Sequence, residues 1–164
     1  MATVCADGTK FAPLIVFKGK NLQSTWRPED GQSVDPETQY AVSDSGWMTT
    51  AVFEQCFESF VEKVKDKTPI ILILDGHLSH TSFKTCDLAR KNDITILKLP
   101  PHCTDLLQPL DVACFAPLKS YYDSELLKFT QSTGGHANLR KDLFVQLLSS
   151  VWDRGLSAGI YIYI

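Results

Sequence analysis

The chain has 164 residues, of which 44% are hydrophobic and 21% charged, a composition typical of one globular domain. A domain of this length buries about two-thirds of its unfolded surface, so it needs neither disulfides nor a structural metal to hold a core. The net charge is −3, from 16 basic and 19 acidic residues. This argues against a strongly basic nucleic-acid-binding arm and leaves room for a local basic groove.

The sequence gives no sign of a membrane or secretory protein. Its longest purely apolar run, 70–74, is far too short to span a bilayer, so no membrane partner is expected. The N-terminus has no basic region followed by an apolar stretch, so a secretory signal is not expected. The five cysteines are odd in number and never form a Cys-x-x-Cys pair, which indicates a reducing intracellular compartment.

The N-terminal third predicts a hairpin and a long polar loop. Residues 4–18 contain Asp7-Gly8, a strong turn signal, followed by an apolar strand at 11–17 that Pro13 assigns to a sheet edge or a bulge. Residues 20–45 are polar and rich in turn formers, so they predict a loop with one short strand near 39–42.

The middle of the chain predicts a helix and then a βαβ crossover. Apolar residues recur with helical spacing over 50–65. The aliphatic run 70–74, a helix at 79–92 and a strand at 94–97 complete the crossover. A strand that is apolar on both faces is expected in the middle of a sheet covered on both sides.

The last third predicts a loop and two helices. Pro100-Pro101 ends the second strand, and an irregular loop runs to Pro109. Amphipathic helices follow at 111–129 and 138–152. They could present a surface to a protein partner, although their apolar faces are typical of core. Residues 158–164 alternate like a strand.

Asp75 and Asp111 are the candidate functional acids. Asp75 directly follows the aliphatic strand, at the edge where α/β sheets bind ligands; it could equally pair with turn N–H groups or cap the next helix. Asp111 starts a helix and could be an N-cap or first-turn acid. If the two acids meet, they are ligands that Mg²⁺ or Mn²⁺ prefers, and such ions support phosphodiester cleavage.

Two histidines close to Asp75 offer a second metal hypothesis. His77 and His80 are three residues apart, but a structural zinc site needs four N or S ligands and only His102 and Cys103 are further candidates. Ordinary turn histidines are the simpler interpretation. The sequence contains neither a Gly-x-Ser-x-Gly elbow nor a Gly-x-x-x-x-Gly-Lys phosphate loop, which excludes two common classes of α/β enzyme.

Three stretches of the chain resemble one family. They read CADGTKFAPLIVFKGK at 5–20, DGHLSH at 75–80 and LPPHCTDLLQPLD at 99–111. They closely resemble the DDE superfamily endonuclease domain, and within it the pogo, Tigger and jerky branch of transposases and transposase-derived proteins, which includes relatives of centromere protein B. The likeness runs from about residue 3 to 152.

The resemblance implies an α/β fold: a ribonuclease-H-like mixed sheet flanked by helices, here lacking the family's first strand. It implies an endonuclease domain over 1–154 that is truncated, with a tail at 155–164. By the same likeness Asp75 is the second and Asp111 the third catalytic acid, both ligands of Mg²⁺ or Mn²⁺. Six further residues are candidates for supporting these acids or contacting DNA: His77, His80, Lys98, His102, Gln108 and Lys119.

The function that the resemblance implies is metal-dependent cleavage or strand transfer on DNA in the nucleus. The family's first acid lies on the strand that this chain lacks, and Asp7, Asp44 and Asp105 are not assigned in its place. The alternative is therefore a catalytically inactive domesticated derivative that serves as a DNA-associated or protein-interaction module. Metal-dependent nicking of DNA distinguishes the two.

Overall fold

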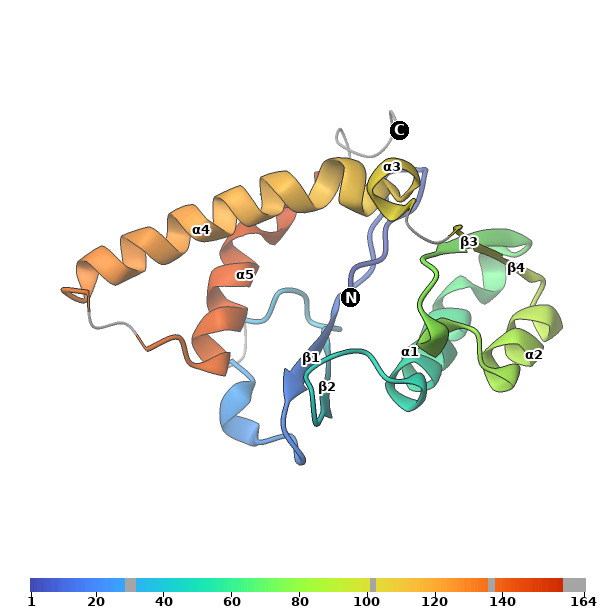
Figure 1. Cartoon of the computed structure of the whole chain (residues 1–164), viewed down its shortest axis with the longest axis horizontal. Coiled ribbons are helices and arrows are strands. Elements are labelled where there is room, and N and C mark those ends of the chain that lie inside the picture. The colour runs from blue at the N-terminus through green and yellow to red at the C-terminus, as the bar shows by residue number, and fades with distance from the viewer. Residues whose placement is uncertain (29–31, 101–102, 136–137, 158–164) are drawn as a thin grey trace.

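The structure, a computed structural model, describes residues 1–28, 32–100, 103–135 and 138–157. Figure 1 shows β1, β2, α4 and α5 in one half of the molecule and α1, α2, β3 and β4 in the other. The predicted α/β class is confirmed. The elements are β1 (Leu14–Lys18), β2 (Gln39–Ser43), α1 (Thr50–Val64), β3 (Ile70–Leu74), α2 (Phe83–Lys91), β4 (Ile94–Lys98), α3 (Thr104–Leu107), α4 (Phe115–Ser132) and α5 (Lys141–Gly155).

The predicted βαβ crossover is present as β3, α2 and β4. The two strands pair in parallel, with Ile70 opposite Ile94 and Leu74 opposite Lys98. The helix starts later than expected because Ser82 caps it: the Ser82 hydroxyl accepts a hydrogen bond from the Thr85 N–H at 3.1 Å. Residues 78–80, of which 79 and 80 were predicted as helix, form a separate 3-10 turn.

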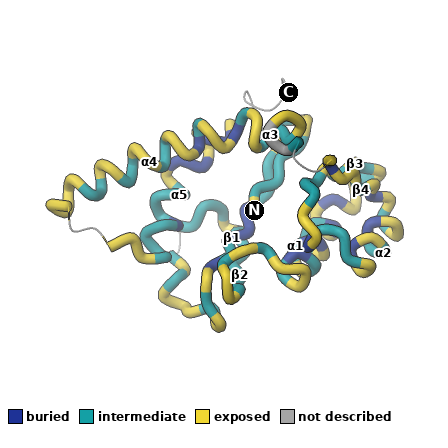
Figure 2. The backbone as a smooth tube through the Cα atoms, in the orientation of Figure 1, coloured by how far each residue is buried: buried dark blue, intermediate teal, exposed yellow. Residues whose placement is uncertain are grey.

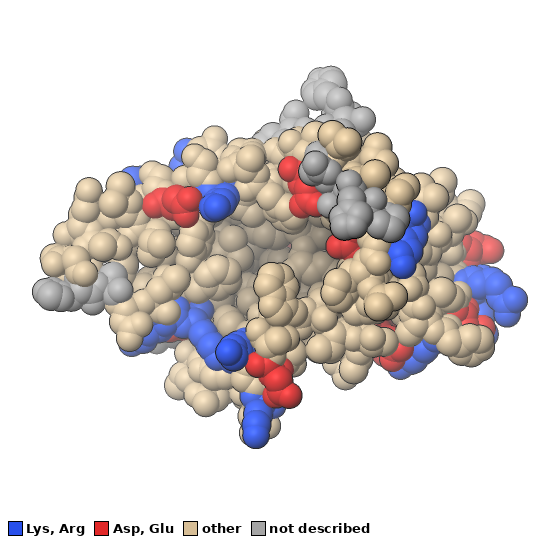
Figure 3. Space-filling view, in the orientation of Figure 1, with Lys and Arg blue, Asp and Glu red and all other residues tan. Residues whose placement is uncertain are grey.

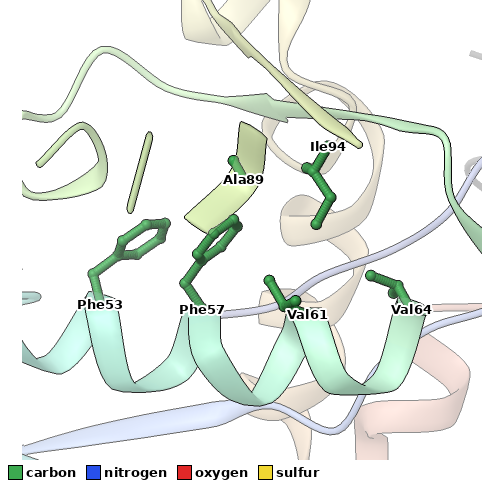
Figure 4. Packing of buried hydrophobic residues seen from close by; sticks show 6 residues of the cluster. All are labelled: Phe53, Phe57, Val61, Val64, Ala89 and Ile94. Carbon is green, nitrogen blue, oxygen red and sulfur yellow. The ribbon is translucent and has the colours of Figure 1, made fainter. Parts of the chain in front are cut away.

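One face of α1 forms a wall of the core in this half (Figure 4). Its buried residues recur every three or four positions, which places them on one side of the helix: Phe53, Phe57, Val61 and Val64. They pack against Ala89 of α2 and Ile94 of β4. The helix begins where predicted because Thr49 accepts a hydrogen bond from the Val52 N–H at 3.3 Å.

The N-terminal hairpin is shorter than predicted. Gly8 adopts a positive φ of 89°, and Val4 and Lys10 form an antiparallel bridge across this turn. The strand β1 begins only after Pro13 and pairs in parallel with β2, with Leu14 opposite Gln39. The short strand predicted near 39–42 is confirmed, and its partner is β1.

The second half is built on the packing of α4 against α5. The two predicted C-terminal helices are confirmed with shifted bounds. Leu118 of α4 and Trp152 of α5 lie in their shared core together with Leu156, which is 1% exposed. Leu156 lies two residues past the domain boundary predicted at 154, which stays a prediction. The strand-like pattern at 158–164 lies outside the described residues.

One face of the β3–β4 pair is open to solvent, contrary to prediction. Ile71 is 69% exposed, Ile73 46% and Leu97 50%, while the opposite face packs on α1 and α2 (Figure 2). The prediction that this strand is covered on both faces is wrong for the described residues, because the helices that pack on the pair lie on one side only. An exposed apolar face is a surface prone to association.

The described strands form two separate parallel pairs, β1–β2 and β3–β4. No strand-to-strand hydrogen bonds among the described residues join the pairs into the single mixed sheet that was predicted. A ribonuclease-H-like sheet therefore stays a prediction.

Candidate functional site

Asp75 and Lys98 lie at the same edge of the β3–β4 pair. Since the strands are parallel, Asp75 follows the carboxyl end of one and Lys98 is the last residue of the other. The Leu99 N–H donates to the Leu74 carbonyl at 2.9 Å, which continues the pairing past Lys98. The predicted location of Asp75 at a strand end is confirmed. The exposed cation Lys98 lies at the same edge.

Both histidines predicted near Asp75 lie in its turn. Oδ1 of Asp75 accepts a hydrogen bond from the His77 N–H at 3.0 Å and lies 2.9 Å from Nδ1 of His80. The second contact is short but not a well-aligned hydrogen bond, because Nδ1 of His80 has no partner at an acceptable angle. Asp75 thus satisfies a turn N–H, as the simpler interpretation held, and it also contacts a histidine ring.

The geometry of the two histidines does not support the zinc hypothesis. Nδ1 of His77 lies 2.7 Å from the Ser79 hydroxyl oxygen and accepts from the Ser79 N–H at 3.3 Å, and Nδ1 of His80 faces Asp75. Within the described ranges no three His, Cys, Asp or Glu side chains are grouped as a metal site. His77 and His80 act here as turn residues.

Burial determines the charge of His80. Removal of its ring from water lowers the pKa of His80 below that of a free histidine, and the nearby Asp75 carboxylate only partly opposes this shift. The ring is therefore neutral at pH 7. Its side chain is 12% exposed and its ring centroid lies 4.3 Å from that of Phe53 in α1. Helical spacing predicted Phe53 only as a core residue, so its support of His80 was missed.

Gly76 is not required by backbone geometry. It has no positive φ, and a Cβ at this position would lie 3.7 Å from the Leu99 carbonyl oxygen and 3.8 Å from Cε of Lys98, both ordinary contacts. The structure thus gives no strain-based reason for a glycine next to Asp75.

Asp111 lies in a π-turn, Leu110–Cys114, that leads into α4. Single π-turns of this kind are frequent at functional sites. The Asp111 N–H donates to the Gln108 carbonyl at 3.0 Å. The side-chain oxygen Oε1 of Gln108 is buried and has no hydrogen-bond partner among the described residues. The segment thus brings an exposed carboxylate and an amide oxygen close together in sequence.

The structure divides the predicted site residues into two groups. Asp75, His77, His80 and Lys98 surround one turn. Asp111 and Gln108 belong to the segment that packs on α3 and α4. Among the described residues the polar contacts of Asp75 are with His77 and His80, and neither of these joins it to Asp111.

Figure 1 shows α3 and the start of α4 between the two halves of the molecule, and Figure 3 shows that this face is hollowed between those halves. Basic and acidic side chains alternate in small groups on the face shown. Lys119 is exposed on α4. His102 lies outside the described residues.

The donor atoms suit a hard divalent cation. Both contacts of Asp75 fall on Oδ1, so Oδ2 carries no hydrogen bond from the described residues. Carboxylate and amide oxygens of this kind are the ligands that Mg²⁺ and Mn²⁺ prefer.

The chain belongs to the DDE superfamily endonuclease family, whose profile matches residues 1–156. It is also 40% identical over 124 residues to a protein of Cochliobolus lunatus named MFS-type transporter clz9. That match covers 74% of this chain and 13% of the transporter-named protein. No helix in the described part of the chain has the length and apolarity needed to cross a membrane. No solved structure matches the chain.

Proposed function

We propose that the chain is a metal-dependent nuclease domain that cleaves DNA phosphodiesters through Asp75 and Asp111 with Mg²⁺ or Mn²⁺. The family supports a nuclease related to transposases. The observation that carries the proposal is the turn after β3, where Oδ1 of Asp75 is held by two contacts and Oδ2 is left for a cation. We further propose the pogo, Tigger and jerky branch, a ribonuclease-H-like arrangement of the strands and nuclear DNA as the substrate.

The residues of the candidate site would have separate tasks. Asp75 and Asp111 would bind the ion from β3 and from the π-turn. When bound, a divalent ion of this kind activates water and stabilises the leaving oxygen. Lys98, at the same strand edge as Asp75, offers a positive charge to a phosphate. Gly76 has no side chain of its own, which would let a phosphate approach the backbone beside Asp75.

One observation favours a second function. The described residues hold no group of three or more metal-ligating side chains. A chain that keeps the scaffold but cannot hold a metal pair would serve as a non-catalytic DNA-associated or protein-interaction module. The exposed apolar face of β3 and β4 would suit a protein partner.

Nicking of supercoiled plasmid by the purified chain in Mn²⁺ tests the proposal. Asp75→Asn and Asp111→Asn keep the size of each side chain and remove its charge. We expect each to reduce nicking by about a hundredfold or more, because each removes a ligand that stabilises the transition state. Asp123→Asn, an exposed acid on α4, is the matched control and should nick like wild type. Absence of nicking by the folded wild-type chain would overturn the nuclease and favour the second function.

A further inference from the structure

His80 approaches Asp75 from the side of the turn that is packed against α1. Its Nδ1 lies 2.9 Å from Oδ1 of Asp75, and the same oxygen accepts the His77 N–H at 3.0 Å. Both contacts converge on one carboxylate oxygen. The other oxygen, Oδ2, has no hydrogen bond or ion pair from the described residues. The carboxylate is therefore held on one side and presented on the other.

The ring of His80 is held in turn by packing. It lies 4.3 Å, centroid to centroid, from Phe53, a residue of the α1 core that is 2% exposed. The preceding residue, Ser79, is 4% exposed, and its hydroxyl and N–H both meet Nδ1 of His77. Since α1 and the 78–80 turn pack together, the ring has little freedom to move away from Asp75.

The contact between His80 and Asp75 is close but is not a well-aligned hydrogen bond. Nδ1 of His80 lies 2.9 Å from Oδ1 of Asp75, but the angle between them lies outside the range of a hydrogen bond. Two acceptor atoms at this distance would repel each other, so a proton on Nδ1 makes the contact favourable.

We propose that His80 is a positioning residue that, with the His77 N–H, holds Oδ1 of Asp75 so that Oδ2 points to a divalent cation. This inference rests on the proposed function, because it assigns His80 a role in the metal site of the nuclease. Partners that orient a metal-binding side chain typically change metal affinity by 10- to 100-fold when they are removed.

Two substitutions separate the ring packing of His80 from its N–H group. His80→Phe keeps an aromatic ring against Phe53 and removes the donor. His80→Asn loses the ring but keeps an N–H group close to the place of Nδ1. Asp75→Asn removes the charge of the carboxylate itself. Affinity for Mn²⁺ alone, followed by the electron paramagnetic resonance signal of the free ion, is measured for the four full-length chains together with their melting temperatures.

We expect His80→Phe to weaken Mn²⁺ binding by about tenfold at an unchanged melting temperature, and His80→Asn to stay within about threefold of wild type. Equal Mn²⁺ affinity of wild type and His80→Phe, with binding lost in Asp75→Asn, would overturn the role of His80 and leave the nuclease proposal intact. A His80→Asn protein that binds Mn²⁺ as weakly as His80→Phe would also overturn it, since an N–H group close to the place of Nδ1 would then not restore binding. Failure of wild type to bind Mn²⁺ would overturn both proposals.

Discussion

Gly155 of α5 lies directly against Leu118 of α4. A Cβ at position 155 would come within 2.7 Å of the Leu118 Cα and closer still to its side chain, which is nearer than real Cβ atoms come. Leu118 is 9% exposed and Leu156 1%, so neither neighbour has room to move. The glycine therefore sets how closely α4 and α5 approach.

Substitution at this position should destabilise the protein. Gly155→Ala is expected to lower the free energy of unfolding by about 1–3 kcal/mol, the usual cost of overpacking a core. Gly76→Ala is the matched control: its Cβ would make only ordinary contacts, so a change within about 0.5 kcal/mol is expected. Urea unfolding of both variants measures this. A Gly155→Ala protein as stable as wild type would show that the helices separate at little cost.

The same control variant tests the role of Gly76 at the site. If a phosphate approaches the backbone beside Asp75, Gly76→Ala should reduce DNA nicking by about tenfold or more while stability stays unchanged, because a methyl group would occupy the approach. Nicking at the wild-type rate would show that no ligand comes close to this part of the turn.

The open face of β3 and β4 should tolerate polar residues. Ile71 and Ile73 are largely exposed, so Ile71→Thr and Ile73→Thr are each expected to change unfolding free energy by less than about 0.5 kcal/mol and to reduce association at high concentration. Phe57 belongs to the face of α1 that covers the other side of these strands, and Phe57→Ala should lower the unfolding free energy by about 3–5 kcal/mol. Thermal unfolding and light scattering give the two readouts. A large loss of stability in Ile71→Thr would mean that this face is covered in solution.

Stability should fall as the pH falls below 7, in part through His80. Burial lowers the pKa of His80 in the folded state below its unfolded value near 6.5. Between these two values the unfolded chain binds more protons than the folded one, so acid favours unfolding. His80→Phe is expected to reduce the difference in unfolding free energy between pH 7.5 and pH 5.5. An unchanged difference in this variant would show that other groups account for the whole effect.

The cysteines should differ in reactivity. Cys86 is exposed, whereas burial raises the pKa of the Cys56 thiol and of the fully buried Cys114 thiol. Because the thiolate is the reactive form, a thiol-specific reagent should modify Cys86 at least about tenfold faster than Cys56 or Cys114 in the native protein. Mass spectrometry of partly labelled protein identifies the sites, and Cys86→Ser should lack the fast phase. Rapid labelling of Cys114 would instead mean that α4 and α5 separate readily.

The sequence by itself determined the local elements of this protein. Caps at Thr49 and Ser82, helical spacing in α1 and the aliphatic run of β3 act over a few residues, so the pattern of residues contains the information. The position of Asp75 at a strand end follows from the same local pattern. The resemblance over 75–80 and 99–111 indicated the family, which the match over 1–156 confirms.

Only the tertiary structure decided which elements meet. The contact of His80 with Phe53, the parallel pairing of β1 with β2, the open face of β3 and the approach of Gly155 to Leu118 all join residues from different elements. Such pairings depend on packing between segments far apart in the chain, and the periodicity of one segment does not specify its partner. For that reason the sequence predicted the acids of the candidate site but neither the histidine contact that orients Asp75 nor the π-turn that carries Asp111.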